Sequence, residues 1–370
     1  MKRRIAIIGA ASGQLPLCQK AREMGLETYC FANKDGGCAE FADHFIPISI
    51  IDKETVARIC REQHIDAIAT NASELTASVA AYVAEQLGTI GPSYKALMAA
   101  HNKAIVRSLA NDIEGFTPIR FSLYSGANDI YPCVVKPTIG AAKKGVSFVE
   151  TPSQFQDAIT YASTDDDTDI LIEEYIYGKE LSIECLSYKG KHYIVQITDK
   201  DSSGPPHFAE LGHHQPAIIS ETIRQKIHKS IPKLLSALDY SNGPSHIECK
   251  YKEDELYLIE ANLRGGGDAI SNQLVQLSTG VDYLKGIIDI ALGTFQETDI
   301  LSHTNSYAGI YYLCAQTARW LPFFETAKQQ AWFVEGQIYS TNLHESHSNY
   351  ERDGYLIYKS SRKIIPLCNE

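Results

Sequence analysis

The sequence lacks three features that would each assign it to a broad class of protein. It has no run of about 18 apolar residues, which a membrane span requires. It has no basic stripe, and 34 basic against 45 acidic residues leave a net charge of −11, unlike a typical nucleic-acid binder. None of its nine cysteines forms a C-x-x-C pair, which argues against zinc ribbons and disulfide scaffolds. We therefore expect a cytoplasmic protein that acts on small molecules, without a nucleic-acid or membrane partner.

The first quarter of the chain alternates strand and helix patterns. Short apolar runs at 5–8, 28–31, 46–48 and 67–70 are typical of buried strands, and helical patterns separate them. This alternation predicts a doubly wound parallel sheet over residues 1–95. The small-residue loop 9–13 lacks G-x-G-x-x-G spacing, so we interpret it as a tight strand-to-helix turn without a bound dinucleotide.

The strongest chemical pattern is a predicted β-hairpin over residues 246–262. Alternate residues of a strand share a face, so Glu260 and Asn262 point the same way. Glu248 joins that face if the turn leaves an odd number of unpaired residues, as when Lys252 pairs with Leu256. Two carboxylates about 5 Å apart repel one another unless a cation lies between them. Oxygen ligands suit Mg²⁺, so the hairpin predicts a magnesium site.

The plain alternative is an exposed hairpin with acids on its wet face. Apolar residues on both faces of the segment 256–259 argue instead for a buried strand, and buried acids need a partner. Arg264 follows two residues after Asn262 and offers a planar cation that can bind a carboxylate or a phosphate. Glycines at 265–267 then expose backbone N–H groups without side chains in the way.

Further motifs precede the hairpin in an informative order. Lys136 ends an apolar strand, and the small-residue loop 138–145 that follows it could fold over phosphates or form an ordinary hairpin turn. The strand 170–176 becomes acidic at its end, where its backbone could pair with an adenine edge. Glu180, in a Gly-x-Glu sequence, is placed to accept hydrogen bonds from ribose hydroxyls.

This order of motifs resembles the ATP-grasp superfamily over nearly the whole chain. The resemblance implies mixed α/β and α+β architecture: an N-terminal doubly wound α/β domain (1–95), a central lobe acting as a lid (96–178), a C-terminal ATP-grasp lobe with the magnesium site (179–300) and a β-rich extension (301–370). It also implies an ATP- and Mg²⁺-dependent carboxylate–amine ligase, in which Mn²⁺ can replace Mg²⁺. Such an enzyme forms an amide through an acyl phosphate and releases ADP and phosphate.

The resemblance assigns roles to single residues. The ATP-binding set is Lys103, Lys136, Lys144, Glu173, Glu174, Tyr175, Ile176 and Glu180. The metal ligands are Glu248, Glu260 and Asn262. The substrate-binding set is Glu210, His213, Arg264, Gly265 and Gly266, and Arg264 is the catalytic residue that steadies the acyl phosphate. The phosphate loop departs from the family pattern, because Ala141-Ala142-Lys143 replaces a serine- and glycine-rich run.

Three segments, 208–217, 260–267 and 350–358, resemble the L-amino-acid ligase branch, near the carbamoyl-phosphate synthetase and biotin carboxylase type. The expected substrates are therefore an amino acid or small carboxylic acid and an amine, and a homodimer is the default assembly. The alternatives are a bicarbonate-activating or purine-pathway ligase, a non-catalytic ATP- or metabolite-binding protein, and an NAD-dependent oxidoreductase. A zinc site at His207, His213 and His214 is disfavoured, because no further Cys or His falls at ligand spacing.

Overall fold

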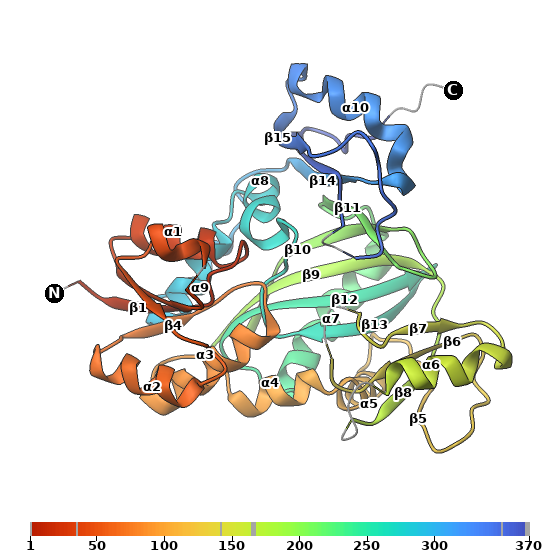
Figure 1. Ribbon diagram of the computed structural model, residues 1–370, viewed down its shortest axis with the longest axis horizontal. Coiled ribbons are helices and arrows are strands. Elements are labelled where there is room, and N and C mark those ends of the chain that lie inside the picture. Colours follow the sequence, from red (N-terminus) through yellow and green to blue (C-terminus); the bar gives the residue numbers. More distant parts are fainter. Residues whose placement is uncertain (1, 35, 141–142, 164–167, 349–350, 367–370) are drawn as a thin grey trace.

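The computed structural model describes residues 2–34, 36–140, 143–163, 168–348 and 351–366. Its strands form three sheets, which Figure 1 shows as an N-terminal unit, a small sheet and a long sheet that runs between them. No helix among the described residues combines the length and the apolar character that crossing a bilayer requires. The eight described cysteines are all buried and unpaired.

The N-terminal sheet has the order β3-β2-β1-β4 with all strands parallel, as predicted. Its strands are β1 (Arg4–Ile8), β2 (Glu27–Ala32), β3 (His44–Pro47) and β4 (Ala67–Ala69). Helices α2 (Lys53–Glu62) and α3 (Glu74–Leu87) cover one face. The other face packs against α1 (Leu15–Glu23) and α9 (Tyr283–Leu292), a helix from much later in the chain. This second contact joins the N-terminal unit to the rest of the protein.

The helical pattern between residues 93 and 111 forms two short helices, α4 (Tyr94–His101) and α5 (Lys103–Asn111). The break occurs at Asn102, whose side chain accepts hydrogen bonds from the backbone N–H groups of Ala104 and Ile105. An N-cap of this kind starts a new helix. Lys103 therefore occupies the first turn of α5, which lies beside the small sheet.

The small sheet has the order β5-β8-β6-β7 and encloses its own apolar cluster. Its strands are β5 (Phe121–Leu123), β6 (Cys133–Pro137), β7 (Ser147–Val149) and β8 (Ile170–Glu174). The short turn η2 (Pro152–Gln154) leads into α6 (Phe155–Ala162), which packs against β6 and β7. The acidic run Asp165-Asp166-Asp167, and Ala141 and Ala142 of the predicted phosphate loop, lie outside the described residues.

The large sheet is antiparallel throughout and has the order β13-β12-β9-β10-β11-β14-β16-β15. Its strands are β9 (Lys179–Tyr188), β10 (Lys191–Ser202), β11 (Glu210–Gln215), β12 (Gly243–Lys252), β13 (Glu255–Asn262), β14 (Tyr307–Leu313), β15 (Phe333–Ile338) and β16 (Gly354–Ser360). The strands of the predicted β-rich extension thus continue this sheet. Tyr350, where the segment that resembles the ligase branch begins, lies outside the described residues.

The long helix α7 (Glu221–Ala237) packs on one face of the large sheet. The helical pattern over residues 278–292 is interrupted, because Gly280 ends α8 (Val275–Thr279) in the left-handed conformation and Asp282 caps the start of α9. The remaining short helices are η1 (Gly37–Glu40), η3 (Ile270–Leu274), η4 (Glu297–Ile300), η5 (Ala315–Trp320), α10 (Leu321–Thr326) and η6 (Ala327–Gln329).

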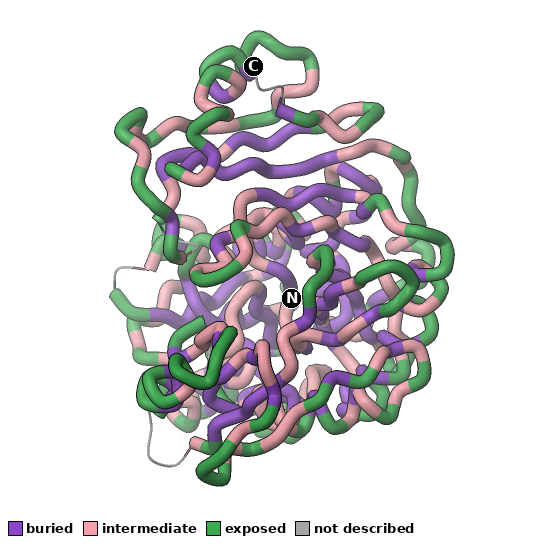
Figure 2. The backbone as a smooth tube through the Cα atoms, turned by 90° about the vertical axis from the view of Figure 1, so that its right-hand side faces the viewer, coloured by how far each residue is buried: buried purple, intermediate pink, exposed green. Residues whose placement is uncertain are grey.

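Apolar and polar side chains alternate along residues 181–185 of β9, all of them buried, and Figure 2 shows the buried chain concentrated in the interior of the molecule. On β9, Leu181, Ile183 and Cys185 are buried in the cluster that includes α7. Ser182 and Glu184 between them are just as buried but face the opposite way, because side chains alternate along a strand. One face of the sheet is therefore apolar and the other carries buried polar groups.

Candidate active site

The hairpin of β12 and β13 brings Glu248 opposite Glu260, although by a different register from the one predicted. Lys252 pairs with Glu255 and not with Leu256, so the turn holds two residues, an even number. Alone, this turn would place the two acids on opposite faces. A β-bulge brings the two acids back to the same face. Cys249 pairs with Leu258 while Glu248 pairs with Glu260, which leaves Ile259 as the extra residue of the bulge. The predicted pairing is wrong, and the predicted juxtaposition of the acids is confirmed.

Arg107 of α5 supports this bulge. Its guanidinium donates to the carbonyl oxygens of Leu258 (2.5 Å) and Ile259 (3.4 Å) and to Oε1 of Glu173 (2.6 Å). It is 3% exposed, so these contacts replace water as its partners. Arg107 thus ties the large sheet to the small one at the point where the two acids are set. No sequence pattern indicated this role, because an arginine on a helix is usually solvated.

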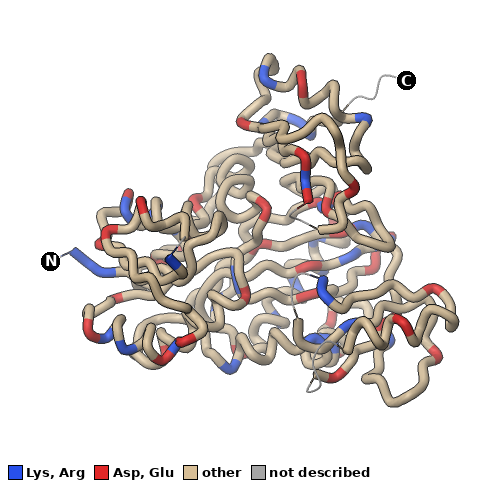
Figure 3. Tube along the Cα trace, viewed as in Figure 1, with Lys and Arg blue, Asp and Glu red and all other residues tan. Residues whose placement is uncertain are grey.

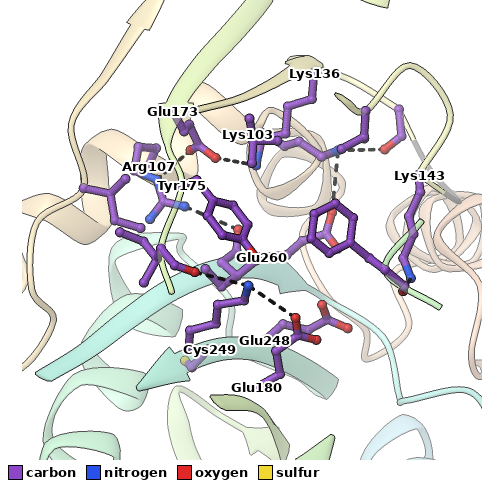
Figure 4. Close-up of a pocket in the computed structure, with 18 of the residues that line it drawn as sticks. Lys103, Arg107, Lys136, Lys143, Glu173, Tyr175, Glu180, Glu248, Cys249 and Glu260 are labelled. Carbon is purple, nitrogen blue, oxygen red and sulfur yellow. Dashed lines mark hydrogen bonds and ion pairs between the residues drawn. The ribbon is translucent and has the colours of Figure 1, made fainter. Parts of the chain in front are cut away.

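A pocket lies where the small sheet meets the large one, and Figure 3 shows charged residues of both signs in this region. The close-up in Figure 4 shows Lys103 and Lys136 near Glu173, and Glu248 and Glu260 nearby on the large sheet. The predicted residues that line the pocket are Lys103, Lys136, Lys144, Glu173, Glu174, Tyr175, Ile176, Glu180, Glu210, Glu248, Glu260 and Arg264. Asn262, His213, Gly265 and Gly266 lie outside its lining.

The two predicted phosphate lysines have different surroundings. Lys103 donates to the carbonyl of Gly140 (2.7 Å), and its Nζ lies 3.6 Å from Oε1 of Glu260. Lys136 forms an ion pair with the buried Glu173. Burial alone would raise the pKa of Glu173, but Arg107 and Lys136 lower it to about 2. The side chain of Glu173 is therefore an ionised structural anchor, and its predicted contact with adenine would rest on its backbone.

The metal-ligand candidates offer oxygen donors on β12 and β13, and two of them, Glu248 and Glu260, line the pocket. Glu248 accepts from Nζ of Lys200 (2.6 Å) and lies 3.1 Å from Nε2 of His246. Glu260 accepts from Nδ2 of Asn262 (3.3 Å). The side chains of Glu248 and Glu260 are 26% and 32% exposed, so each still faces the pocket. Two opposed carboxylates and an amide carbonyl fit a hard divalent cation such as Mg²⁺.

A set of buried residues, His246, Glu184 and Gly266, lies next to these candidate ligands and supports them. His246 lies between Glu184 and Glu248, and these carboxylates, opposing the effect of burial, raise its pKa to about 9. Glu184 also accepts from the backbone N–H of Gly266 (3.0 Å). A Cβ on Gly266 would lie 2.7 Å from Nδ1 of His246, so any larger residue here would force His246 to shift. The N–H of Gly266, predicted to face substrate, is used inside the protein.

Further buried charges lie beyond Glu210. Nε2 of His213 lies 3.2 Å from Glu210 and 3.6 Å from Asp268. Arg352 makes two 3.0 Å hydrogen bonds to Asp268, and Lys200 lies 3.1 Å from Glu210. Asp268, Arg352 and Lys200 were not predicted. Lys200 had a detectable signal, because it is a lysine within a long strand pattern.

Arg264 reaches toward the N-terminal unit. Its guanidinium lies 3.7 Å from Oε1 of Glu74, the first residue of α3. Its Nε is buried without a hydrogen-bond partner among the described residues. Burial, with the nearby Glu260, raises the pKa of Glu74. Arg264 and Glu74 thus bring opposite charges from different units to one wall of the pocket.

The three histidines weighed as a zinc site lie in three different environments. His207 lies with Glu345 and His347, and its ring stacks on that of His347. His213 lies with Glu210 and Asp268. His214, on the other face of β11, contacts Asp201 and Tyr358. They therefore do not converge on one ion.

Comparison with known proteins assigns this architecture. Residues 130–273 match the family model described as an ATP-grasp domain. The chain is similar to the solved L-amino acid ligase from Bacillus licheniformis, with a TM-score of 0.81, 23% identity and coverage of 98% of this chain and 94% of that one. It is also similar to a biotin carboxylase–β,γ-ATP complex from Campylobacter jejuni, with a TM-score of 0.74, 18% identity and coverage of 98% and 88%.

Among curated proteins, the formate-dependent phosphoribosylglycinamide formyltransferase of Wolinella succinogenes is 23% identical over 277 residues, which cover 70% of each chain. The chain spans 14% to 42% of the length of the first curated relatives that it matches. The solved structures match this chain over nearly its whole length at low identity, so they establish the fold alone. Residues 130–273 therefore form an ATP-grasp domain, and the chain as a whole has the fold of the ATP-grasp enzymes.

Proposed function

We propose that this protein is an ATP- and Mg²⁺-dependent ligase that activates a carboxylate as an acyl phosphate and transfers the acyl group to an amine. The observation that carries the proposal is the bulged hairpin. It sets Glu248 opposite Glu260 in a pocket that also holds Lys103 and Arg264. Acids paired in this way, with cations around them, suit phosphoryl transfer, which depends on positioning and on neutralising charge.

Different walls of the pocket would bind the base and ribose, the phosphates and the metal ion. The strand end 173–176 and Glu180 would hold the base and ribose, while Lys103, Lys136 and Lys144 would face the phosphates. Glu248, Glu260 and Asn262 would hold Mg²⁺, which when bound supplies charge neutralisation to the transferred phosphoryl group. Lys136 is already paired with Glu173, so Lys103, the more loosely paired of the two, is the better placed to shift toward a phosphate.

Arg264 is the proposed catalytic residue for acyl transfer. It lines the same pocket as Glu260, and its guanidinium, whose Nη2 lies 3.7 Å from Glu74, can donate to a developing oxyanion. Glu74, whose pKa is raised, faces the same wall and is a candidate contact for the amine. Glu210 and His213 are candidate contacts for the carboxylate substrate. The small sheet, which has its own core, would close over the pocket and keep water from the acyl phosphate.

The proposed substrate class is an amino acid or small carboxylic acid with an amine. Similar proteins include an L-amino acid ligase, a formate-dependent phosphoribosylglycinamide formyltransferase and a biotin carboxylase domain in complex with bicarbonate, so their names mention three different small acids. Formate and bicarbonate therefore belong beside the amino acids in any substrate test. A purine-pathway amine belongs there for the same reason.

The test is a screen of substrate-dependent ADP release over these acids and amines, with wild type, Glu260→Ala and Arg264→Ala. We expect each variant to lose at least about 10²-fold in turnover. Glu255→Ala, an exposed acid on the same hairpin, is the matched control and should keep full activity. Unchanged ADP release in both site variants would overturn the proposal. Tight ATP binding without turnover for every pair would favour a non-catalytic binding protein.

A further inference from the structure

A buried lysine lies at the base and ribose end of the pocket, where none of the proposed catalytic steps uses it. Lys250 is on β12, two residues after Glu248, so both face the pocket. Its residue is 7% exposed. Removing an ammonium group from water is costly unless its partners compensate. Lys250 can therefore stay buried only if neighbouring groups replace the water that its ammonium has lost.

The ammonium of Lys250 has two acceptors among the described residues. Nζ lies 3.3 Å from the carbonyl oxygen of Ile176, in the strand end proposed to hold the base. It also lies 3.3 Å from Oε1 of Glu180, the proposed ribose contact. Figure 4 shows Glu180 beside Cys249 and Glu248 of β12.

Two aromatic rings complete the surroundings of Lys250. Its Nζ lies 4.8 Å from the ring centroid of Tyr175 and 5.9 Å from that of Phe208, distances at which a cation is attracted to a ring face. These contacts add to the two acceptors in holding the ammonium of Lys250 beside Glu180.

Glu180 would be much less constrained without this lysine. Its side chain is 24% exposed, which leaves a glutamate several rotamers at a pocket wall. A carboxylate has about four lone-pair sites, so it can accept from Lys250 and from ribose hydroxyls at once. Fixing a flexible side chain before binding removes an entropic cost that the ligand would otherwise have to offset.

We propose that Lys250 is a positioning residue that holds Glu180 ready for the two ribose hydroxyls and thereby makes the site select ribonucleotides. The inference rests on the proposed function, since it assumes that an adenine nucleotide occupies the pocket. It adds a specificity that the phosphate and metal contacts do not provide, because those groups are the same in a nucleotide that lacks ribose hydroxyls.

The test compares the dissociation constants of ATP and 2′,3′-dideoxy-ATP, measured by calorimetry with Mg²⁺. A lost hydrogen bond to a charged group corresponds to roughly 10- to 150-fold in affinity, so wild type should prefer ATP by about 10-fold or more. Glu180→Gln should lose most of this preference. Lys250→Met and Lys250→Gln should reduce it at least about 3-fold. Lys252→Met, which removes an exposed lysine from the same strand, should leave it unchanged.

The ratio of the two constants separates positioning from a general loss of structure. A misfolded pocket would weaken both nucleotides together and leave the ratio as it was. The inference is overturned if the Lys250 variants keep the wild-type ratio, whether or not overall affinity changes. If wild type binds neither nucleotide, the proposed function fails and this inference fails with it. Using both methionine and glutamine keeps the test open should one variant fail to fold.

Discussion

The two faces of the large sheet bury different kinds of side chain. The face toward α7 is apolar, with Leu181, Ile183 and Ile247 fully buried. The face toward the pocket instead buries polar and charged groups, among them Glu184, Lys200 and His246. Burial of apolar surface stabilises with few geometric demands, whereas each buried ion depends on a particular partner. The same strands thus have one face whose burial sets few geometric demands and another face whose ions each need a particular partner.

Two neighbouring histidines on β11 show the difference most directly. Although burial lowers it, Asp268 and Glu210 raise the pKa of His213 above its ordinary value. Burial lowers the pKa of His214 to about 4, and Asp201 opposes this only in part. One residue type, at adjacent positions and equal burial, is pushed in opposite directions by the face on which it lies.

The largest effect should come from removing a central cation of the pocket face. Lys200→Met leaves Glu210 and Glu248 without the ammonium that lies 3.1 Å and 2.6 Å from them. Losing one partner of a buried ion pair costs about 3–5 kcal/mol. Urea unfolding at pH 7.5 would measure this loss in the free energy of unfolding.

The matched control for that variant lies on the same strand. Lys191 starts β10, and its side chain is 72% exposed beside Glu297. Exposed ion pairs add little to stability, so Lys191→Met should unfold like wild type. If Lys200→Met also unfolds like wild type, the pocket face tolerates its charges singly, and the contrast between the two faces is wrong.

The sequence predicted the architecture well because alternation and periodicity record which side chains are buried. The parallel sheet over 1–95 and the hairpin over 246–262 follow from such patterns. It predicted helix ends less well: the interruptions at Asn102 and Gly280 depend on single residues inside long helical patterns. Tertiary contacts outweigh local preference at these points.

The candidate site was predictable only where several motifs fell in order. Glu248 and Glu260 were paired correctly, but the bulge that pairs them depends on Arg107, 151 residues before Leu258. Lys250 and Arg352 were missed for the same reason, because their partners are distant in the chain. A spacing rule within one segment cannot reveal such contacts. The assigned roles of individual site residues remain predictions until variants are measured.

A smaller and pH-dependent effect would sharpen the contrast between His213 and His214. The folded-state pKa of His214 lies below its unfolded value of about 6.5, so its stabilising neutral form is lost as pH falls from about 6.5 toward 4. Between pH 7.5 and 4.5, the free energy of unfolding of wild type should fall by about 2 kcal/mol more than that of His214→Gln. Urea unfolding of both proteins across this range would measure the difference.

His213 should show the opposite sign. Its folded-state pKa is raised, so the stability that its protonated form contributes is complete below about 6.5 and declines as pH rises through the folded value. The difference in the free energy of unfolding between wild type and His213→Gln (the gap) should therefore be largest near pH 6 and smaller at pH 9. If the gap for both variants moves in the same direction with pH, the two histidines do not have different environments.

The smallest effect tests whether the apolar face is independent of the chemistry. Ile247 lies between His246 and Glu248 in the chain, is 0% exposed and packs toward α7. Ile247→Val removes one methylene group, which typically costs about 0.5–1.5 kcal/mol of stability. Because its side chain points away from the pocket, ADP release should be unchanged once a substrate pair is known. A fall in turnover larger than the loss of stability explains would show that packing beneath the hairpin sets the positions of the acids.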